Sequence, residues 1–182
     1  MDNNSHEKIP KVVILQRICP SYRIALFSKL TSCETIDIQL LIGDDVPNTK
    51  IKSASDLSGV RHKKLRTKFI NLFGRILVLH LGLIRKLKAV KPDVILCEAD
   101  SHFLGYIKAI FYRTFINRNT KLLYWCFIEL PGRPNERSIV HSLIKKITRS
   151  FFDGFVLYST FSKDALVKRG YDPESMFIAT NV

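Results

Sequence analysis

The sequence has no cysteine pair in a C-x-x-C arrangement and no glycine-rich phosphate motif, and each absence excludes a class of protein. Its four cysteines are scattered without a Cys/His cluster, which argues against a disulfide framework, a zinc site and a thioredoxin-type redox motif. None of its eight glycines forms a G-x-G-x-x-G or P-loop pattern, and no G-x-S-x-G occurs. We expect no dinucleotide or ATP site, no hydrolase nucleophile elbow and no metal, since Asp100-x-His102 alone is a weak metal signal.

Long apolar runs are also missing. The longest uncharged apolar-rich stretch, residues 76–84, is far shorter than the roughly 20 residues that span a bilayer. The start, MDNNSHEKIP, lacks the basic-then-apolar layout of a secretory signal. Apolar residue types make up 46% of the 182 residues, which suffices for the core of one domain. We expect a single domain over residues 1–182 that is cytoplasmic, and soluble or peripheral to a membrane.

Positive charge is what the sequence has in excess. It contains 29 Lys and Arg against 16 Asp and Glu, a net charge of +13 with neutral histidines. Residues 50–91 hold twelve basic side chains and one acid, Asp56, and residues 101–128 hold four more and no acid. Such a surface attracts polyanions, either nucleic acid or anionic lipid, although a solvated face without a dedicated partner remains open.

Apolar runs of strand length alternate with segments at helical spacing. We predict strands over residues 11–16, 36–42, 93–97, 121–127, 154–158 and 176–180, and a short one near 62–65. We predict helices over residues 22–30, 68–90, 102–116, 136–151 and 162–169. Strands separated by helices imply parallel pairing with right-handed crossovers. The fold class is therefore α/β, a Rossmann-like three-layer sandwich with a mostly parallel sheet.

Open α/β sheets bind ligands at the loops that follow the carboxyl ends of their strands. The chemistry-bearing side chains in these loops are Arg17, Cys19, Asp44, Asp45, Glu98, Asp100, His102, Glu129, Ser159, Thr160 and Asn181. They favour a polar cleft, while the serines are equally expected as helix caps. His80, Tyr124 and Trp125 lie in apolar segments and are interpreted as core residues.

Residues 20–30, PSYRIALFSKL, resemble the P-x-Y-R-x-x-L-F-x-x-L opening of the N-terminal domain in glycosyltransferase family 4, whose enzymes have the two-domain GT-B fold. The likeness continues at residues 91–98, 122–125 and 156–160, at Lys163, Leu166 and Gly170, and at residues 177–181. It covers nearly the whole chain in the right order, and the motifs are individually loose but fairly specific together.

The resemblance implies that residues 1–182 form the acceptor-side half of a GT-B enzyme and that the donor-binding C-terminal domain is absent. We expect the acceptor-binding half of a nucleotide-sugar-dependent, retaining glycosyltransferase for cell-surface polysaccharide or glycolipid. Because transfer requires groups from both halves, this chain should be inactive alone. No cofactor is expected here, since the nucleotide-sugar would bind the missing domain, which could lie on a separate chain. A fragment, a split enzyme and a non-functional remnant all remain open.

The resemblance also suggests which residues and partners matter. The acceptor-binding candidates are Tyr22, Arg23, Glu98, Asp100, His102 and Glu129, and the interdomain-cleft candidates are Ser159, Thr160 and Asn181. Arg23 would meet an anionic acceptor or a diphosphate. The expected partner is a sugar or lipid-linked acceptor, with the basic segment 61–91 resting on anionic lipid at the inner face of the cytoplasmic membrane. A nucleic-acid-binding α/β domain is the alternative, but the sequence has no recognition motif for it and we do not expect nucleic acid as a partner.

Overall fold

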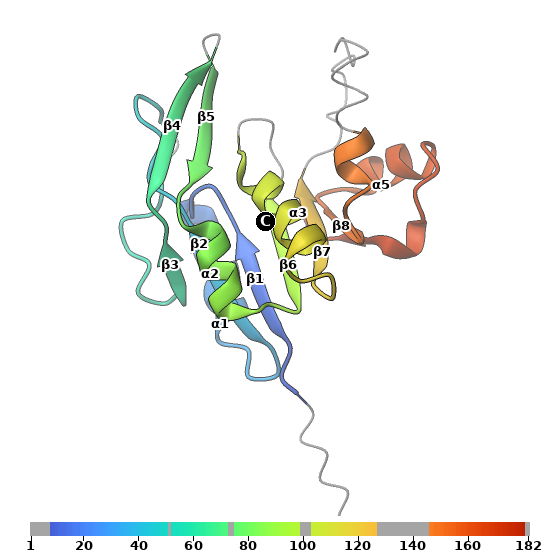
Figure 1. The fold of residues 1–182 in the computed structure, drawn as a ribbon, viewed down its shortest axis with the longest axis horizontal. Coiled ribbons are helices and arrows are strands. Elements are labelled where there is room, and N and C mark those ends of the chain that lie inside the picture. Colours follow the sequence, from blue (N-terminus) through green and yellow to red (C-terminus); the bar gives the residue numbers. More distant parts are fainter. Residues whose placement is uncertain (1–7, 51, 73–74, 99–102, 127–145, 181–182) are drawn as a thin grey trace, which may run out of the picture.

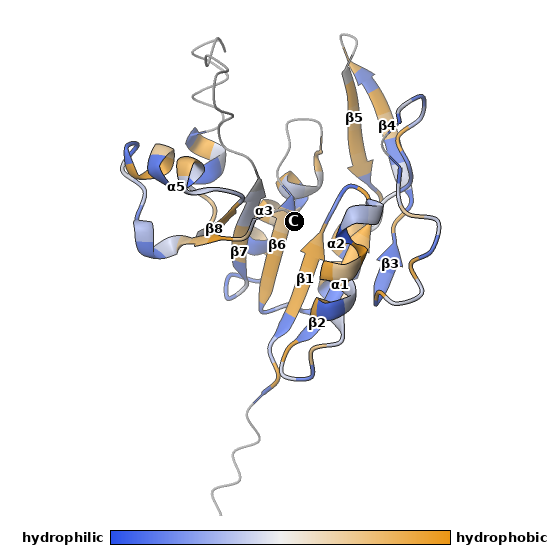
Figure 2. Cartoon of the chain, turned by 180° about the vertical axis from the view of Figure 1, so that it is seen from behind, coloured by the Kyte–Doolittle hydropathy of each residue, from blue (hydrophilic) through white to orange (hydrophobic). Residues whose placement is uncertain are grey.

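Seven parallel strands form one sheet in the order β3-β2-β1-β6-β7-β8-β9 (Figure 1). The computed structural model describes residues 8–50, 52–72, 75–98, 103–126 and 146–180. The sheet strands are β1 (Lys11–Leu15), β2 (Asp37–Ile42), β3 (His62–Lys64), β6 (Val94–Glu98), β7 (Lys121–Cys126), β8 (Gly154–Leu157) and β9 (Met176–Ile178). The apolar central strands β1 and β6 are adjacent in the sheet, as the hydropathy colouring shows (Figure 2).

Helices connect the strands and lie on both sides of the sheet. They are α1 (Ile24–Thr31), which follows the short 3-10 helix η1 (Ser21–Arg23), then α2 (Leu83–Val90), α3 (Gly105–Phe115) and α5 (Thr160–Val167), with a 3-10 helix η2 (Pro173–Ser175) before β9. Local sequence sets several of the boundaries. Gly82, at φ 70°, precedes α2, and Lys91, at φ 50°, ends it just before Pro92, which cannot continue a helix. Within the described residues, no helix combines the length and apolar character needed to cross a membrane.

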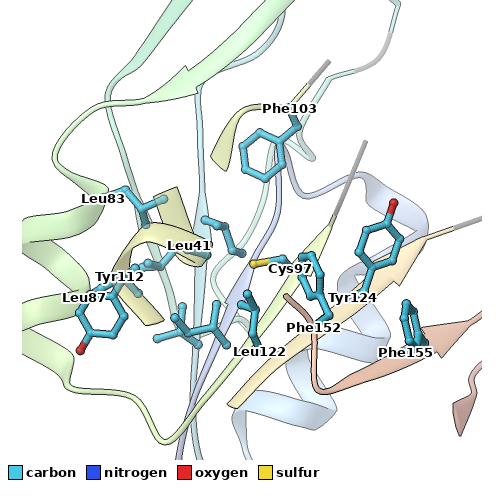
Figure 3. Packing of buried hydrophobic residues seen from close by; sticks show 14 of the residues in the cluster. Leu41, Leu83, Leu87, Cys97, Phe103, Tyr112, Leu122, Tyr124, Phe152 and Phe155 are labelled. Carbon is cyan, nitrogen blue, oxygen red and sulfur yellow. The ribbon is translucent and has the colours of Figure 1, made fainter. Parts of the chain in front are cut away.

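Side chains alternate between two faces of the sheet, and each face has its own core. On the side that we call the α3 face, strand residues such as Ile95 and Leu122 share one buried cluster with residues of α2, α3 and α5. Figure 3 shows part of this cluster, with Leu83 and Leu87 of α2 and Tyr112 of α3. On the opposite side, the α1 face, Ile14 and Leu40 pack with Phe27 of α1. The predicted α/β sandwich with a parallel sheet is therefore confirmed.

The predicted helix over residues 68–90 is wrong in its first half. Strands β4 (Thr67–Leu72) and β5 (Arg75–His80) pair antiparallel as a hairpin, and of the described residues in this range only Leu83–Val90 is helical, as α2. The hairpin projects beyond the end of the main sheet (Figure 1). Leucines and isoleucines three and four residues apart matched a helical period, but the same run also alternates, with Val78 and His80 buried and their neighbours half-buried. The helix predicted over residues 68–90 would be apolar on nearly all sides, and such a pattern is also compatible with strands.

The other predicted elements agree closely with the structure. The short strand near residues 62–65 exists as β3, the strand over 176–180 shortens to β9, and the helix over 102–116 shortens to α3. Of the helix predicted over 136–151, residues 146–149 are helical, and residues 136–145 lie outside the described part of the chain.

Candidate functional site

The carboxyl ends of the parallel strands meet at one edge of the sheet, and polar side chains gather there. Gln16 follows β1, Glu98 ends β6, Trp125 stands near the end of β7 and Tyr158 follows β8. Since these strands are parallel neighbours, their last residues come close together although they are far apart in sequence. Arg23, on η1 after β1, joins them.

Arg23 is the centre of this group. Its side chain is buried, and its guanidinium donates hydrogen bonds to Gln16 Oε1 at 2.5 Å and to the Tyr158 hydroxyl at 2.6 Å. The Glu98 carboxylate lies 3.9 Å from the same guanidinium. A buried cation requires such partners, because its desolvation would otherwise cost several kcal/mol, of the order of the protein's whole stability. One charged side chain therefore links the ends of β1, β6 and β8.

Aromatic rings complete the surroundings of this guanidinium. Its central carbon lies 4.9 Å from the centroid of the Trp125 ring, 5.5 Å from that of Tyr22 and 5.9 Å from that of Tyr158. Each distance is within the range of a cation–π interaction. Tyr22 is exposed and the other two rings are buried, so the cluster extends from the core to the surface.

Glu98 is held at the surface end of the cluster. Its Oε2 accepts a hydrogen bond from the backbone N–H of Arg17 at 2.9 Å, while Oε1 faces Arg23. The side chain keeps 22% of its surface exposed. Of the acidic acceptor-binding candidates, Glu98 is the one that lies within the described residues, and it is both fixed and partly accessible.

Three buried N–H groups around Arg23 have no hydrogen-bond acceptor within the described residues. They are Gln16 Nε2, Arg23 Nε and Trp125 Nε1. An unpaired buried donor costs about 1–3 kcal/mol, so such groups call for an explanation. All three belong to the group of side chains around the Arg23 guanidinium.

The β4–β5 hairpin attaches beside this edge through its own polar contacts. The Asp44 backbone N–H donates to Thr67 Oγ1 at 2.8 Å, and the Thr67 N–H donates to the Asp44 carboxylate at 2.9 Å. Lys108 of α3 donates to the His80 carbonyl at 2.8 Å. A Cβ at Gly43 would lie 2.3 Å from His80 Nε2, so only glycine fits where β2 ends against the hairpin. These contacts hold the hairpin in place.

His80 is buried as predicted and stays neutral at physiological pH. Burial lowers its pKa to about 4, the Lys108 ammonium acts in the same direction, and the Arg17 carbonyl and Asp44 partly oppose them. Neither ring nitrogen makes a well-formed hydrogen bond to the described residues. Its ring instead packs edge-on against Phe103, 4.8 Å between centroids.

The buried thiols near the site are not nucleophiles at neutral pH. Burial raises the pKa of Cys19, although the positive charge of Arg23 opposes this, and burial also raises the pKa of Cys97. A reactive cysteine needs the opposite shift, toward the thiolate. Among the residues that the structure describes, no three His, Cys, Asp or Glu side chains cluster in a way that could hold a metal ion.

The structure brings three of the predicted site residues together, Tyr22, Arg23 and Glu98. Ser159 caps α5, accepting the Ser162 backbone N–H at 3.3 Å, and Thr160 is the first residue of that helix. The start of α5 accounts for the presence of both residues. Their predicted place in an interdomain cleft stays a prediction. The remaining candidates, Asp100, His102, Glu129 and Asn181, lie outside the described residues.

Sequence reasoning missed Gln16, Trp125 and Tyr158 as partners of Arg23. A signal for the first was present, because Gln16 is the one polar side chain at the end of the apolar run KVVILQ. Trp125 was interpreted as core, which is correct for its burial, but its contact with a guanidinium was not foreseeable. That contact depends on residues 102 positions apart in the chain, from 23 to 125.

No family model matches this sequence, and no curated protein sequence matches it either. Solved structures do match. A UDP-N-acetylglucosamine 2-epimerase superposes with a TM-score of 0.59 at 17% identity, over 94% of this chain and 48% of that chain. The lipopolysaccharide outer core galactosyltransferase WaaB gives 0.56 at 13%, over 93% and 45%. Anabaena HepE in complex with UDP and glucose gives 0.57 at 13%, over 94% and 44%.

These matches show the fold, which is the Rossmann-like domain of GT-B enzymes. The predicted resemblance to an N-terminal GT-B domain is confirmed at that level. The chain spans less than half the length of each of these three proteins. These proteins include an epimerase and a galactosyltransferase, so the shared fold does not by itself specify a reaction.

Proposed function

We propose that this chain is the acceptor-side half of a nucleotide-sugar-dependent glycosyltransferase that builds cell-surface polysaccharide or glycolipid. The observation that carries the proposal is the Arg23–Glu98 cluster at the carboxyl edge of a GT-B-type sheet. Ligands of open α/β sheets bind at that edge. The sequence motif PSYRIALFSKL, which resembles family 4 transferases, supplies Arg23 and the η1 turn that positions it.

The chemistry of the cluster suits a polyhydroxylated or phosphorylated acceptor. Glu98 offers carboxylate oxygens to sugar hydroxyls, and the exposed Tyr22 ring offers an apolar face on which a sugar ring can stack. Since its guanidinium already holds Gln16 and Tyr158, Arg23 acts chiefly by orienting Glu98 and the aromatic rings, a narrower role than direct contact with a diphosphate.

Donor binding and transfer belong, in this proposal, to a second GT-B half of similar size. The nucleotide-sugar binds that half, and transfer occurs where the two carboxyl edges face each other. The isolated 182 residues then bind acceptor but do not turn over, because the donor is not positioned against the acceptor oxygen.

The test separates acceptor binding from donor binding. Saturation-transfer NMR with the purified chain should detect extracted lipid-linked oligosaccharide in detergent micelles and should not detect UDP or UDP-glucose. Glu98→Gln, which keeps the shape of the side chain, should weaken acceptor binding by about tenfold through loss of a charge-assisted hydrogen bond. The matched control is Glu34→Gln, an exposed glutamate after α1 that lies away from this edge.

Three results would contradict the proposal. Micromolar binding of UDP by the chain alone would place the donor site here, and interconversion of UDP-N-acetylglucosamine on adding a second half would indicate an epimerase, as in some structural neighbours. Tight, steeply salt-dependent binding to DNA or RNA would favour the alternative of a nucleic-acid-binding domain.

A further inference from the structure

The outward side of α3 carries large apolar side chains that the described part of the chain leaves exposed. Ile107, Phe111 and Phe115 recur at four-residue steps and are 50%, 48% and 71% exposed. Four residues is close to one helical turn, so these side chains form a stripe along the helix. The Phe111 and Phe115 rings lie 5.1 Å apart, while Ala109 and Tyr112 on the other side of α3 are buried in the core.

Exposed cations lie on α2, the helix that contacts α3, and neither helix contains an acid. α2 is a neighbour of α3 on the same face of the sheet and carries Arg85 and Lys88 at exposed positions, followed by Lys91 where it ends. Neither α2 nor α3 contains Asp or Glu. Arg85, Lys88, Ile107, Phe111 and Phe115 together define what we call the α2–α3 surface.

We propose that the α2–α3 surface docks on an anionic lipid bilayer. The aromatic and aliphatic stripe enters the headgroup boundary, and the cations of α2 meet lipid phosphates, as in interfacial amphipathic helices. This proposal rests on the proposed function, in which the acceptor is lipid-linked. Binding to a bilayer requires neither donor nor acceptor, so it is tested separately.

Charge distinguishes this occupant from a second copy of the chain. A two-fold contact through the same surface would bring two acid-free, cationic helix pairs together, in a protein of net charge +13. An anionic bilayer offers the complementary charge, worth about 1 kcal/mol for each Lys or Arg near its surface. The structure also divides the basic segment 61–91 that the sequence associated with lipid, since only its last part, α2, belongs to this surface.

The test is co-sedimentation of the full chain with vesicles of phosphatidylcholine alone or with about one third phosphatidylglycerol. The wild type should bind the anionic vesicles and leave the neutral ones, with binding lost as salt is raised. The pair Phe111→Ser and Phe115→Ser should lower the partition coefficient by at least about tenfold through loss of inserted apolar area. Phe177→Ser is the matched control, because this phenylalanine is 58% exposed on β9, whose side chain belongs to the α1 face.

A second pair of variants tests the cations. Lys88→Glu on α2 should lower binding by about fivefold or more, while Lys29→Glu, exposed on α1, should have little effect. Equal losses for the paired variants on the two faces, or no preference for anionic vesicles, would overturn the proposal. So would a concentration-dependent dimer in sedimentation equilibrium that Phe111→Ser abolishes, since the surface would then be an interface between copies. Circular dichroism of each variant verifies that the fold is retained.

Discussion

The two faces of the sheet are packed differently. Along β6, residues on the α3 face, Ile95 and Cys97, are fully buried, whereas Val94 and Leu96 on the α1 face are half-buried. Several described helices cover the α3 face, while α1 is the described helix that packs on the other. The α3 face therefore supplies most of the apolar burial that stabilises the fold.

The α1 face instead holds the buried guanidinium of Arg23. Trp125 and Tyr158 belong to its core cluster and also contact Arg23, so the polar cluster at the carboxyl edge is built into this face. The difference indicates a division of labour, in which one face provides stability and the other positions the chemistry. A fold can carry such a cluster when its opposite face supplies enough apolar burial to offset the cost.

The largest effect should come from truncating the same residue type on each face. Leu122→Ala on the α3 face removes a fully buried side chain and should lower the free energy of unfolding by about 3 kcal/mol. Leu96→Ala, half-buried on the α1 face, should cost about 1 kcal/mol, because its side chain already meets solvent. Urea unfolding measures both, and equal losses would remove the distinction between the faces.

Arg23 is expected to matter nearly as much as a core leucine. Arg23→Met leaves the Glu98 carboxylate and the Gln16 carbonyl without their cation and should cost about 2–3 kcal/mol. Arg61, which pairs with Asp37 at 2.6 Å on the surface, is the matched control. Arg61→Met should cost less than about 1 kcal/mol. If the two variants lost equal free energy of unfolding in the same denaturation assay, the buried Arg23 cluster would contribute no more to stability than a surface ion pair.

His80 should make stability depend on pH. Its folded pKa of about 4 lies below the ordinary value of 6.5, so the unfolded chain binds the proton more tightly and stability falls as pH drops from about 6.5 toward 4. The loss between pH 7 and pH 5 should be about 2 kcal/mol. His80→Leu removes this titration, so the free energy of unfolding of the wild type relative to the variant should be about 2 kcal/mol lower at pH 5 than at pH 7. A pH-independent difference would show that the ring titrates normally.

The smallest stability effect is expected on the exposed stripe of α3. Phe111→Ser and Phe115→Ser should each change the free energy of unfolding by no more than about 0.5 kcal/mol, because the rings are largely in solvent. Thermal unfolding followed by circular dichroism measures the change. A loss as large as that of Leu122→Ala would mean that these rings are part of the core.

Local pattern was sufficient for most of the strands and failed for the hairpin. The runs KVVIL and VILCE are short, apolar and bounded by polar or proline residues, so their strand character does not depend on distant contacts. Residues 67–80 satisfied two periods at once, and the helical one was chosen. The structure has the strand alternative, with β4 paired to β5 and Thr67 bonded to Asp44, and the second contact joins residues 23 positions apart, which no local pattern reveals.

The sequence by itself determined the alternation of strands and helices, the excess of positive charge and the polar residues that end the strands, because these properties belong to short segments. Only the tertiary structure decided that Arg23 would be buried against Gln16, Trp125 and Tyr158. It also decided which side of α3 stays exposed. The physical reason is that burial and partnership are set by strand order, which brings the ends of β1, β6, β7 and β8 together, and no local pattern encodes that order.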